Sequence, residues 1–285
     1  MHEPILIGDI GSTKSTWWYG TAKPEQLNLP GYNPITHNDT AREALFKHLR
    51  QQTGSESFSS IWYYGAGVID QQISQAISQD LKVFFPTSSI HVHSDLTGAC
   101  IAACGENAGT VVILGTGSHA AVWDGNKIVR QATALGYILG DEGSGCDIGK
   151  SLIQAYFYKE MPDHIRISMD EKIPKGRSGF FSAFQTSEAP NQFLADFARV
   201  AVAFQEDPWI KSLITSRFSL FIKRHVLPLA PNGQIHVVGS IGSIFASLIN
   251  QELDKNQLEA GNFIQDPAKR LFERHHEYGK KENRD

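Results

Sequence analysis

A short apolar strand that leads into a glycine-serine turn occurs twice in this chain. The copies read ILIGDIGST at 5–13 and VVILGTGSH at 111–119. Each predicts a β-hairpin, because an apolar run, a glycine turn and a second β-rich run follow one another. A shift of 106 positions aligns the two glycine-serine pairs, Gly11-Ser12 and Gly117-Ser118. Glycine lets the backbone approach an anion closely, and adjacent amides with a hydroxyl can hold an oxyanion. Two such turns therefore predict a polyphosphate held from two sides.

Residues around the first turn strengthen this hypothesis. A lone glycine-serine turn is commonly no more than a turn. Here Asp9 ends the preceding strand, where its carboxylate can reach Mg²⁺ through water or can cap the turn. Thr13 and Lys14 follow with a hydroxyl and a cation. The repeat and these side chains together favour a nucleotide site.

Composition limits the class of protein. A chain of 285 residues with 41% hydrophobic and 20% charged residues is expected to form one large or two medium globular domains. Its net charge of −4 argues against nucleic acid or an anionic membrane as a partner. No apolar run approaches the ~20 residues that span a bilayer, and the start lacks the pattern of a signal peptide. Three cysteines predict reduced thiols and a cytoplasmic location. Cys100 and Cys104, four apart, are expected to pack in a helix.

The order of predicted elements indicates two α/β domains, 1–106 and 107–285. After each hairpin, helices alternate with short strands. A loop is expected at 29–34, an insertion or an irregular cap at 160–190, and an isolated strand at 235–238. The predicted helices cover about 40–52, 69–84, 95–104, 148–159, 191–206, 208–227 and a segment from 267, and further strands cover 60–64, 90–93 and 127–130.

Three further positions carry possible chemistry, each with a structural alternative. Asp95 follows Ser94 at a strand-to-helix junction, where it is a helix cap or a general base for phosphoryl transfer. Asp141 lies in a glycine-rich run and stabilises a turn or accepts hydrogen bonds from sugar hydroxyls. Gly239 and Ser240 follow an apolar strand and suit a flat adenine ring, although such junctions are common. His91, His93, His119 and the pair at 275–276 lack metal-ligand spacing and are expected to be core or surface residues.

Three motifs give this sequence a family resemblance. They are GDIGSTKS at 8–15, ILGTGS at 113–118 and LGYILGDEGSG at 135–145. No phosphate loop of the GxxxxGK[ST] type, no GxGxxG fingerprint and no HExxH zinc site is present. The chain resembles the N-acetylglucosamine kinase-like proteins of the BadF/BadG/BcrA/BcrD ATPase family, within the actin-like and sugar-kinase superfamily. The resemblance covers nearly the whole chain and is weakest across 160–190.

The resemblance implies a fold and a set of site residues. The fold is α/β, a two-domain duplicated ribonuclease H-like arrangement with mixed five-stranded sheets and MgATP in a cleft between the domains. A final helix at about 267–280 would pack back on the N-terminal domain. By position, Asp9 would hold the metal, and Gly239 and Ser240 would contact adenosine. The phosphate groups would be bound by Gly11, Ser12, Thr13, Lys14, Thr116, Gly117 and Ser118. The catalytic base would be Asp95, and the sugar would contact Asn33, Asp95, Asp141, Ala134, Leu135 and Gly136.

The chain also departs from the family pattern. Ala134-Leu135-Gly136 stands where many sugar kinases have Gly-Trp-Gly, which leaves the exact sugar open. Ile10 replaces a small residue in the first turn.

The favoured hypothesis is an ATP-dependent kinase for a hydroxyl of an amino sugar, the 6-hydroxyl of N-acetylglucosamine or a position on N-acetylmuramic acid, acting as a monomer or homodimer. One alternative is an activator ATPase of the 2-hydroxyacyl-CoA dehydratase or benzoyl-CoA reductase type. Its relatives hold an iron–sulfur cluster with interface cysteines. A non-catalytic sugar or nucleotide sensor is the other.

Overall fold

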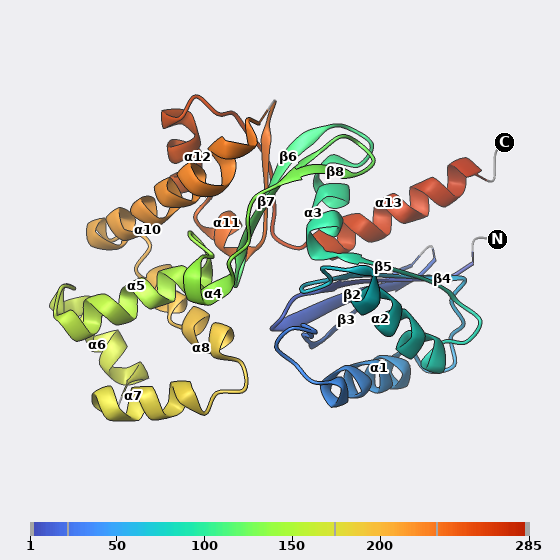
Figure 1. Cartoon of the computed structure of the whole chain (residues 1–285), viewed down its shortest axis with the longest axis horizontal. Helices are drawn as coiled ribbons and strands as arrows, with labels where there is room; N and C mark the ends of the chain where they lie inside the picture. The colour runs from blue at the N-terminus through green and yellow to red at the C-terminus, as the bar shows by residue number, and fades with distance from the viewer. Residues whose placement is uncertain (1–2, 22, 174, 232, 283–285) are drawn as a thin grey trace. The chain divides into compact units, whose positions relative to one another are not determined.

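The computed structural model describes residues 3–21, 23–173, 175–231 and 233–282. The chain divides into two compact units (Figure 1). One runs up to Glu106 and resumes at Asp266, and the other is Asn107–Gln265. No helix of the described residues is both long enough and apolar enough to cross a membrane.

The first unit is a five-stranded mixed sheet with helices on both faces. The strand order is β3-β2-β1-β4-β5, in which β1 pairs antiparallel with β2 and parallel with β4. Its strands are β1 (Ile5–Ile10), β2 (Lys14–Gly20), β3 (Glu25–Pro30), β4 (Ser60–Gly65) and β5 (Ser89–Ser94). Its helices are α1 (Asp39–Thr53), α2 (Gln71–Phe84), α3 (Asp95–Cys104) and α13 (Pro267–Glu282).

Alternation along β1 explains how the two faces are covered. Leu6 and Ile10 belong to a core with α1 and α2, whereas Ile7 belongs to a core with α3 and α13. Successive strand residues point to opposite faces, so one apolar strand serves both layers. Helix α13 packs on α3, β1 and β2, and therefore belongs to the first unit although it ends the chain.

The second unit repeats the same sheet. Its order is β8-β7-β6-β9-β10, with β6 antiparallel to β7 and parallel to β9. The strands are β6 (Gly109–Leu114), β7 (Ser118–Trp123), β8 (Ile128–Gln131), β9 (Ile235–Val238) and β10 (Ala260–Ile264). The strand predicted as isolated at 235–238 is therefore not isolated, because β9 lies between β6 and β10.

The register corrects the alignment of the two copies. The last ladder pair before the turn is Ile10 with Ser15 in the first unit and Leu114 with Ser118 in the second. Ile10 thus corresponds to Leu114, a smaller shift than the 106 positions predicted. The second turn is also one residue shorter, so Gly11 corresponds to Gly115.

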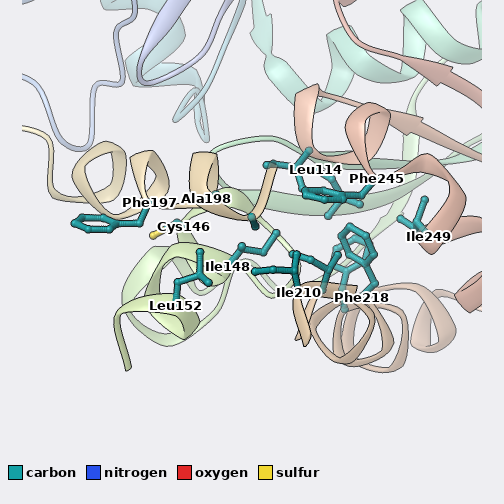
Figure 2. Packing of buried hydrophobic residues seen from close by; sticks show 14 of the residues in the cluster. Leu114, Cys146, Ile148, Leu152, Phe197, Ala198, Ile210, Phe218, Phe245 and Ile249 are labelled. Carbon is teal, nitrogen blue, oxygen red and sulfur yellow. The ribbon is translucent and has the colours of Figure 1, made fainter. Parts of the chain in front are cut away.

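Helices of the second unit enclose a large apolar core. Figure 2 shows Leu114 of β6 and Phe218 of α10 among the packed side chains of this core. The helices are α4 (Gly136–Leu139), α5 (Gly145–Tyr158), α6 (Asp163–Lys172), α7 (Gly176–Gln185), α8 (Pro190–Asp196), α9 (Ala198–Ala203), α10 (Pro208–Phe221), α11 (Ser240–Ile244) and α12 (Ala246–Lys255). A π-helical turn at Ile222–Val226 and a 3₁₀ turn at Leu227–Leu229 follow α10.

Two predicted features of this unit were wrong. The segment 160–190 is not irregular: it forms α6 and α7, whose Ile165, Met169 and Phe180 are buried in the core. The helix predicted over 191–206 is broken at Phe197 into α8 and α9.

Candidate functional site

The first turn joins β1 to β2 and leaves polar groups without partners. The Gly11 N–H donates to the Lys14 carbonyl at 3.0 Å and closes the turn. Within the described residues, no group accepts a hydrogen bond from the N–H of Ser12 or Thr13. The Thr13 hydroxyl is buried and also has no partner there. A turn with such donors is suited to an oxyanion.

Gly31 and Asn33 hold the first turn from the loop that follows β3. The Gly31 N–H donates to the Thr13 carbonyl at 3.1 Å, and the Asn33 amide donates to Ser12 Oγ at 2.9 Å. A Cβ at Gly31 would lie 2.2 Å from the Gly11 carbonyl oxygen. Only glycine permits this approach. The predicted sugar-binding asparagine is thus bonded to the predicted phosphate turn.

Three carboxylates influence one another at the carboxyl ends of the parallel strands. Burial, together with the charges of Asp95 and Asp266, raises the pKa of the partly buried Asp9 to about 7, and Lys14 opposes them. Asp266 caps α13 by accepting from the Ala268 N–H at 3.1 Å. The sequence marks Asp266 only as a helix start, an Asp before Pro, and its proximity to Asp9 comes from the return of α13 to the first unit. No cluster of three or more His, Cys, Asp or Glu within the described residues is arranged to hold a metal ion.

Asp95 begins α3, but it is not the residue that caps this helix. Ser94 Oγ accepts from the Thr97 N–H at 3.2 Å, while Asp95 Oδ1 accepts from the Leu96 N–H at 2.8 Å. Ser94 pairs with Gly65, and Gly65 with Ile10, in the parallel ladders. Asp95 therefore lies at the same sheet edge as the first turn.

The second turn joins β6 to β7 and is held by the start of α5. The Gly145 N–H donates to the Gly115 carbonyl at 2.8 Å, and the Cys146 N–H donates to the Thr116 carbonyl at 3.1 Å. The Ser118 hydroxyl is buried and has no partner among the described residues. The equivalent bond in the first unit runs from the Tyr32 N–H to the Gly11 carbonyl, so both turns are braced alike.

The structure brings three predicted residues of the second unit together. The Ser118 N–H acts on the Asp141 carboxylate, and a Cβ on Gly117 would lie 3.1 Å from Asp141 Oδ2. Burial raises the pKa of Asp141, while the Ser118 N–H and the nearby Lys150 oppose that rise. Asp141 also has a φ of 61°, a left-handed conformation that non-glycine residues rarely adopt.

Charged side chains that the sequence did not single out hold the loop after Asp141. Glu142 is buried and is paired with Arg224 and with His225 Nε2, the latter at 2.7 Å. Burial opposes ionisation, but the bonds from His225 and Arg224 lower the pKa of Glu142 to about 2. Asp147 pairs with Arg217 through two bonds of 2.7 and 2.9 Å. Their partners come from α10 and the turn after it, so sequence spacing gave no sign of them.

The remaining candidates occupy two places in the second unit. Ala134, Leu135 and Gly136 are exposed, and Gly136 is the first residue of α4. Gly239 has a φ of 114°, and a Cβ there would lie 2.5 Å from the Leu114 carbonyl oxygen. Ser240 begins α11.

A polar groove adjoins the end of α11. It lies between α10 and α12 and has a volume of about 740 Å³. Ser216 and Ser219 of α10, together with Ile244 and Phe245, are among its lining residues. The Gly239–Ser240 loop therefore leads, through one short helix, to a groove of the second unit.

Solved structures resemble this chain over nearly its whole length. A "Putative N-acetylglucosamine Kinase" from Porphyromonas gingivalis is 29% identical, with a TM-score of 0.89 over 96% of this chain and 99% of that one. A protein of the same description from Chromobacterium violaceum is 17% identical, with a TM-score of 0.73 over 95% and 98%. A ROK family glucokinase from Streptomyces griseus, solved with glucose and AMPPNP, is 12% identical, with a TM-score of 0.57 over 92% and 93%.

These similarities confirm the predicted fold class, an α/β actin-like ATPase fold with two mixed five-stranded sheets. Two of these neighbours are described as putative N-acetylglucosamine kinases and one as a glucokinase. No protein-family model matches the sequence, and no curated protein matches it.

Proposed function

We propose that this protein is an ATP-dependent sugar kinase that phosphorylates a hydroxyl of an amino sugar, with the 6-hydroxyl of N-acetylglucosamine as the first acceptor to test. N-acetylmuramic acid is the second acceptor. The observation that carries the proposal is the pair of equivalent turns with unpartnered donors, at Ser12-Thr13 in one unit and Ser118 in the other. The likeness to the Porphyromonas protein, at 29% identity over almost the full length, supports the class of substrate.

The phosphate chain of ATP would be bound by both turns. Turn amides and hydroxyls without protein partners are donors that a phosphate oxygen can satisfy. Lys14 adds a cation beside the first turn. In the second unit, Gly239 and Ser240 would contact adenosine, and the groove between α10 and α12 offers it space.

Asp9 is the residue best suited to hold Mg²⁺. Its carboxylate has a pKa raised to about 7 by burial and by Asp95 and Asp266, so a cation there would relieve the repulsion of three carboxylates. When bound, Mg²⁺ would neutralise charge on the phosphate oxygens. Mg²⁺ keeps much of its hydration, which suits a site with few protein ligands.

Asp95 would act on the acceptor hydroxyl. It would accept the hydroxyl proton while the oxygen forms a bond to the γ-phosphorus and the bond from phosphorus to the ADP oxygen breaks. Asn33 and Asp141 would hold other hydroxyls of the sugar. Domain closure would exclude water, which otherwise competes as acceptor.

The motifs at 8–15, 113–118 and 135–145 support placing the chain with the N-acetylglucosamine kinase-like group of the BadF/BadG/BcrA/BcrD ATPase family. We place its action in the cytoplasm, where its cysteines stay reduced. The activator ATPase alternative is not favoured. Cys100 and Cys104 are buried in α3, and burial raises the pKa of Cys104 to about 11, whereas cluster ligands must be thiolates.

The test is ATP consumption across a panel of amino sugars, with Asp95→Asn as the decisive variant. We expect this variant to retain nucleotide binding while its transfer rate falls by about 10²–10⁴-fold. Asp39→Asn, at an exposed position of the first unit, is the control and should remain active. Undiminished transfer by Asp95→Asn would remove Asp95 from the mechanism. The proposal would be refuted if none of the amino sugars increased ATP consumption by the wild-type protein.

A further inference from the structure

Lys150 of α5 reaches back to the segment that precedes Asp141. Its Nζ donates to the Tyr137 carbonyl at 2.6 Å and makes a longer contact of 3.5 Å with the Gly140 carbonyl. The side chain is half-buried. One cation thus contacts both the middle and the end of the segment 135–141.

Tyr137 packs against the core of the second unit, but the other apolar side chains of that segment are exposed. Helix α4 has four residues, and a helix of one turn is marginal without tertiary support. Ile138 and Leu139 are each 71% exposed, so their apolar side chains add little packing. Gly136, the first residue of α4, has a φ of 68°, and Asp141 is itself in a left-handed conformation. The bonds from Lys150 therefore add to the packing of Tyr137 in holding this segment.

The same cation acts on the carboxylate at the end of the segment. Burial raises the pKa of Asp141; the Ser118 N–H, Lys150 and His119 lower it, and Glu142 raises it. The thiol of Cys146 also faces Asp141 and has its own pKa raised, mainly by burial. Lys150 is the one lysine or arginine among these neighbours of Asp141 in the described part of the chain.

We propose that Lys150 is a positioning residue of the acceptor site, which fixes the segment 135–141 and thereby places the Asp141 carboxylate to accept hydrogen bonds from the sugar. This inference rests on the proposed kinase function. Lys150 touches the backbone of the segment and acts on the acceptor through Asp141. It should consequently affect sugar binding more strongly than ATP binding.

The kinetic test compares Lys150→Met with Lys150→Arg. The Met variant removes a charged hydrogen bond, so the KM for the acceptor sugar should rise by about tenfold to a hundredfold. The KM for ATP should rise by a smaller factor, because Asp141 also adjoins Gly117 of the second turn. Loss of the cation raises the pKa of Asp141, so the acid limb of the pH profile of kcat/KM should move to higher pH. The Arg variant keeps the charge and should return that limb to its wild-type position. Lys223→Met, at an exposed lysine of the same unit, is the control.

A second measurement needs no substrate. Hydrogen–deuterium exchange of the peptide that covers 135–141 should speed up in Lys150→Met and stay at the wild-type rate in Lys223→Met. If exchange is faster in Lys150→Met but the wild-type protein phosphorylates no sugar, the kinase function is refuted. The role of Lys150 in holding the segment 135–141 then still stands. Unchanged exchange, or equal rises in both KM values with no shift of the pH limb, would overturn the positioning role.

Discussion

The side-chain amide of Asn33 donates a hydrogen bond to the hydroxyl of Ser12 at 2.9 Å. A residue predicted to bind sugar is thereby attached to a turn predicted to bind phosphate. The Asn33 side-chain oxygen accepts from the Ile35 N–H at 2.9 Å, and a Cβ on Gly67 would lie 2.2 Å from that oxygen. Asn33 therefore links the loop after β3, the loop after β4 and the first turn.

This relationship predicts that Asn33→Ala changes the binding of both substrates. The variant loses the bond that orients Ser12, and a neutral hydrogen bond of this kind is worth about 1 kcal/mol, or roughly fivefold in a binding constant. We expect the KM values for ATP and for the sugar to rise together, as measured by steady-state kinetics. Asn28→Ala, on the exposed edge strand of the same unit, is the matched control. A rise in the sugar KM alone would show that the bond to Ser12 does not matter for the turn.

Gly115 gives a test of the second turn that separates binding from folding. A Cβ at Gly115 would meet nothing within 4 Å, whereas a Cβ at Gly239 would lie 2.5 Å from the Leu114 carbonyl oxygen. Gly115→Ala should therefore fold with a melting temperature close to that of the wild type. If a phosphate occupies the open space, the added methyl group should weaken ATP binding by about tenfold or more, as measured by calorimetry. Gly239→Ala should instead lower the melting temperature, and wild-type ATP affinity in Gly115→Ala would place the phosphate elsewhere.

The fold was more predictable from sequence than the details around the site. Helix α3 was predicted with its observed bounds, because a Ser-Asp start and a run of small apolar residues are strong local signals. Strand β3 was missed, since Pro30 and Gly31 favour a loop, yet a proline is tolerated on an edge strand. The prolines and glycines of 160–190 likewise masked α6 and α7, whose helical state depends on burial of a few apolar side chains.

The site residues that escaped prediction share one cause. Asp266 and Lys150 act on residues far away in sequence or across a loop, and their spacing carries no motif. The repeat was found from its sequence, but matching the two glycine-serine pairs displaced the register, because Ile10 and Leu114 are the residues that hold the same place in the ladders. The hydrogen bonds accepted by the carbonyls of Gly11 and Gly115, and not sequence alignment, show that these two glycines are counterparts.

A cluster of histidine and aromatic rings where α13 packs on the sheet predicts that the free energy of unfolding falls in acid. His275 stacks on Trp62 with ring centroids 4.0 Å apart, and its Nε2 lies 2.7 Å from the Tyr64 hydroxyl. Burial, with the nearby His93 and His91, lowers the pKa of His275 to about 4. The pKa values of His91 and His93 are also lowered, mainly by burial. The folded state therefore holds these rings neutral at a pH where an unfolded chain would protonate them.

The sign of the effect follows from proton binding. Between pH 6.5 and about 4 the unfolded chain binds more protons at His275 than the folded chain, so the free energy of unfolding falls as the pH is lowered through this window. The contribution of His275 amounts to about 2–3 kcal/mol by pH 4.5. His275→Phe keeps an aromatic ring on Trp62 but does not titrate, so the loss of stability between pH 7 and 4.5, measured by urea denaturation, should shrink by about that amount. His48→Phe, at an exposed histidine of α1, should leave the loss unchanged. Because His91 and His93 remain, some dependence on pH should persist in His275→Phe. A loss as large as in the wild type would mean that His275 is not held neutral where α13 packs on the sheet.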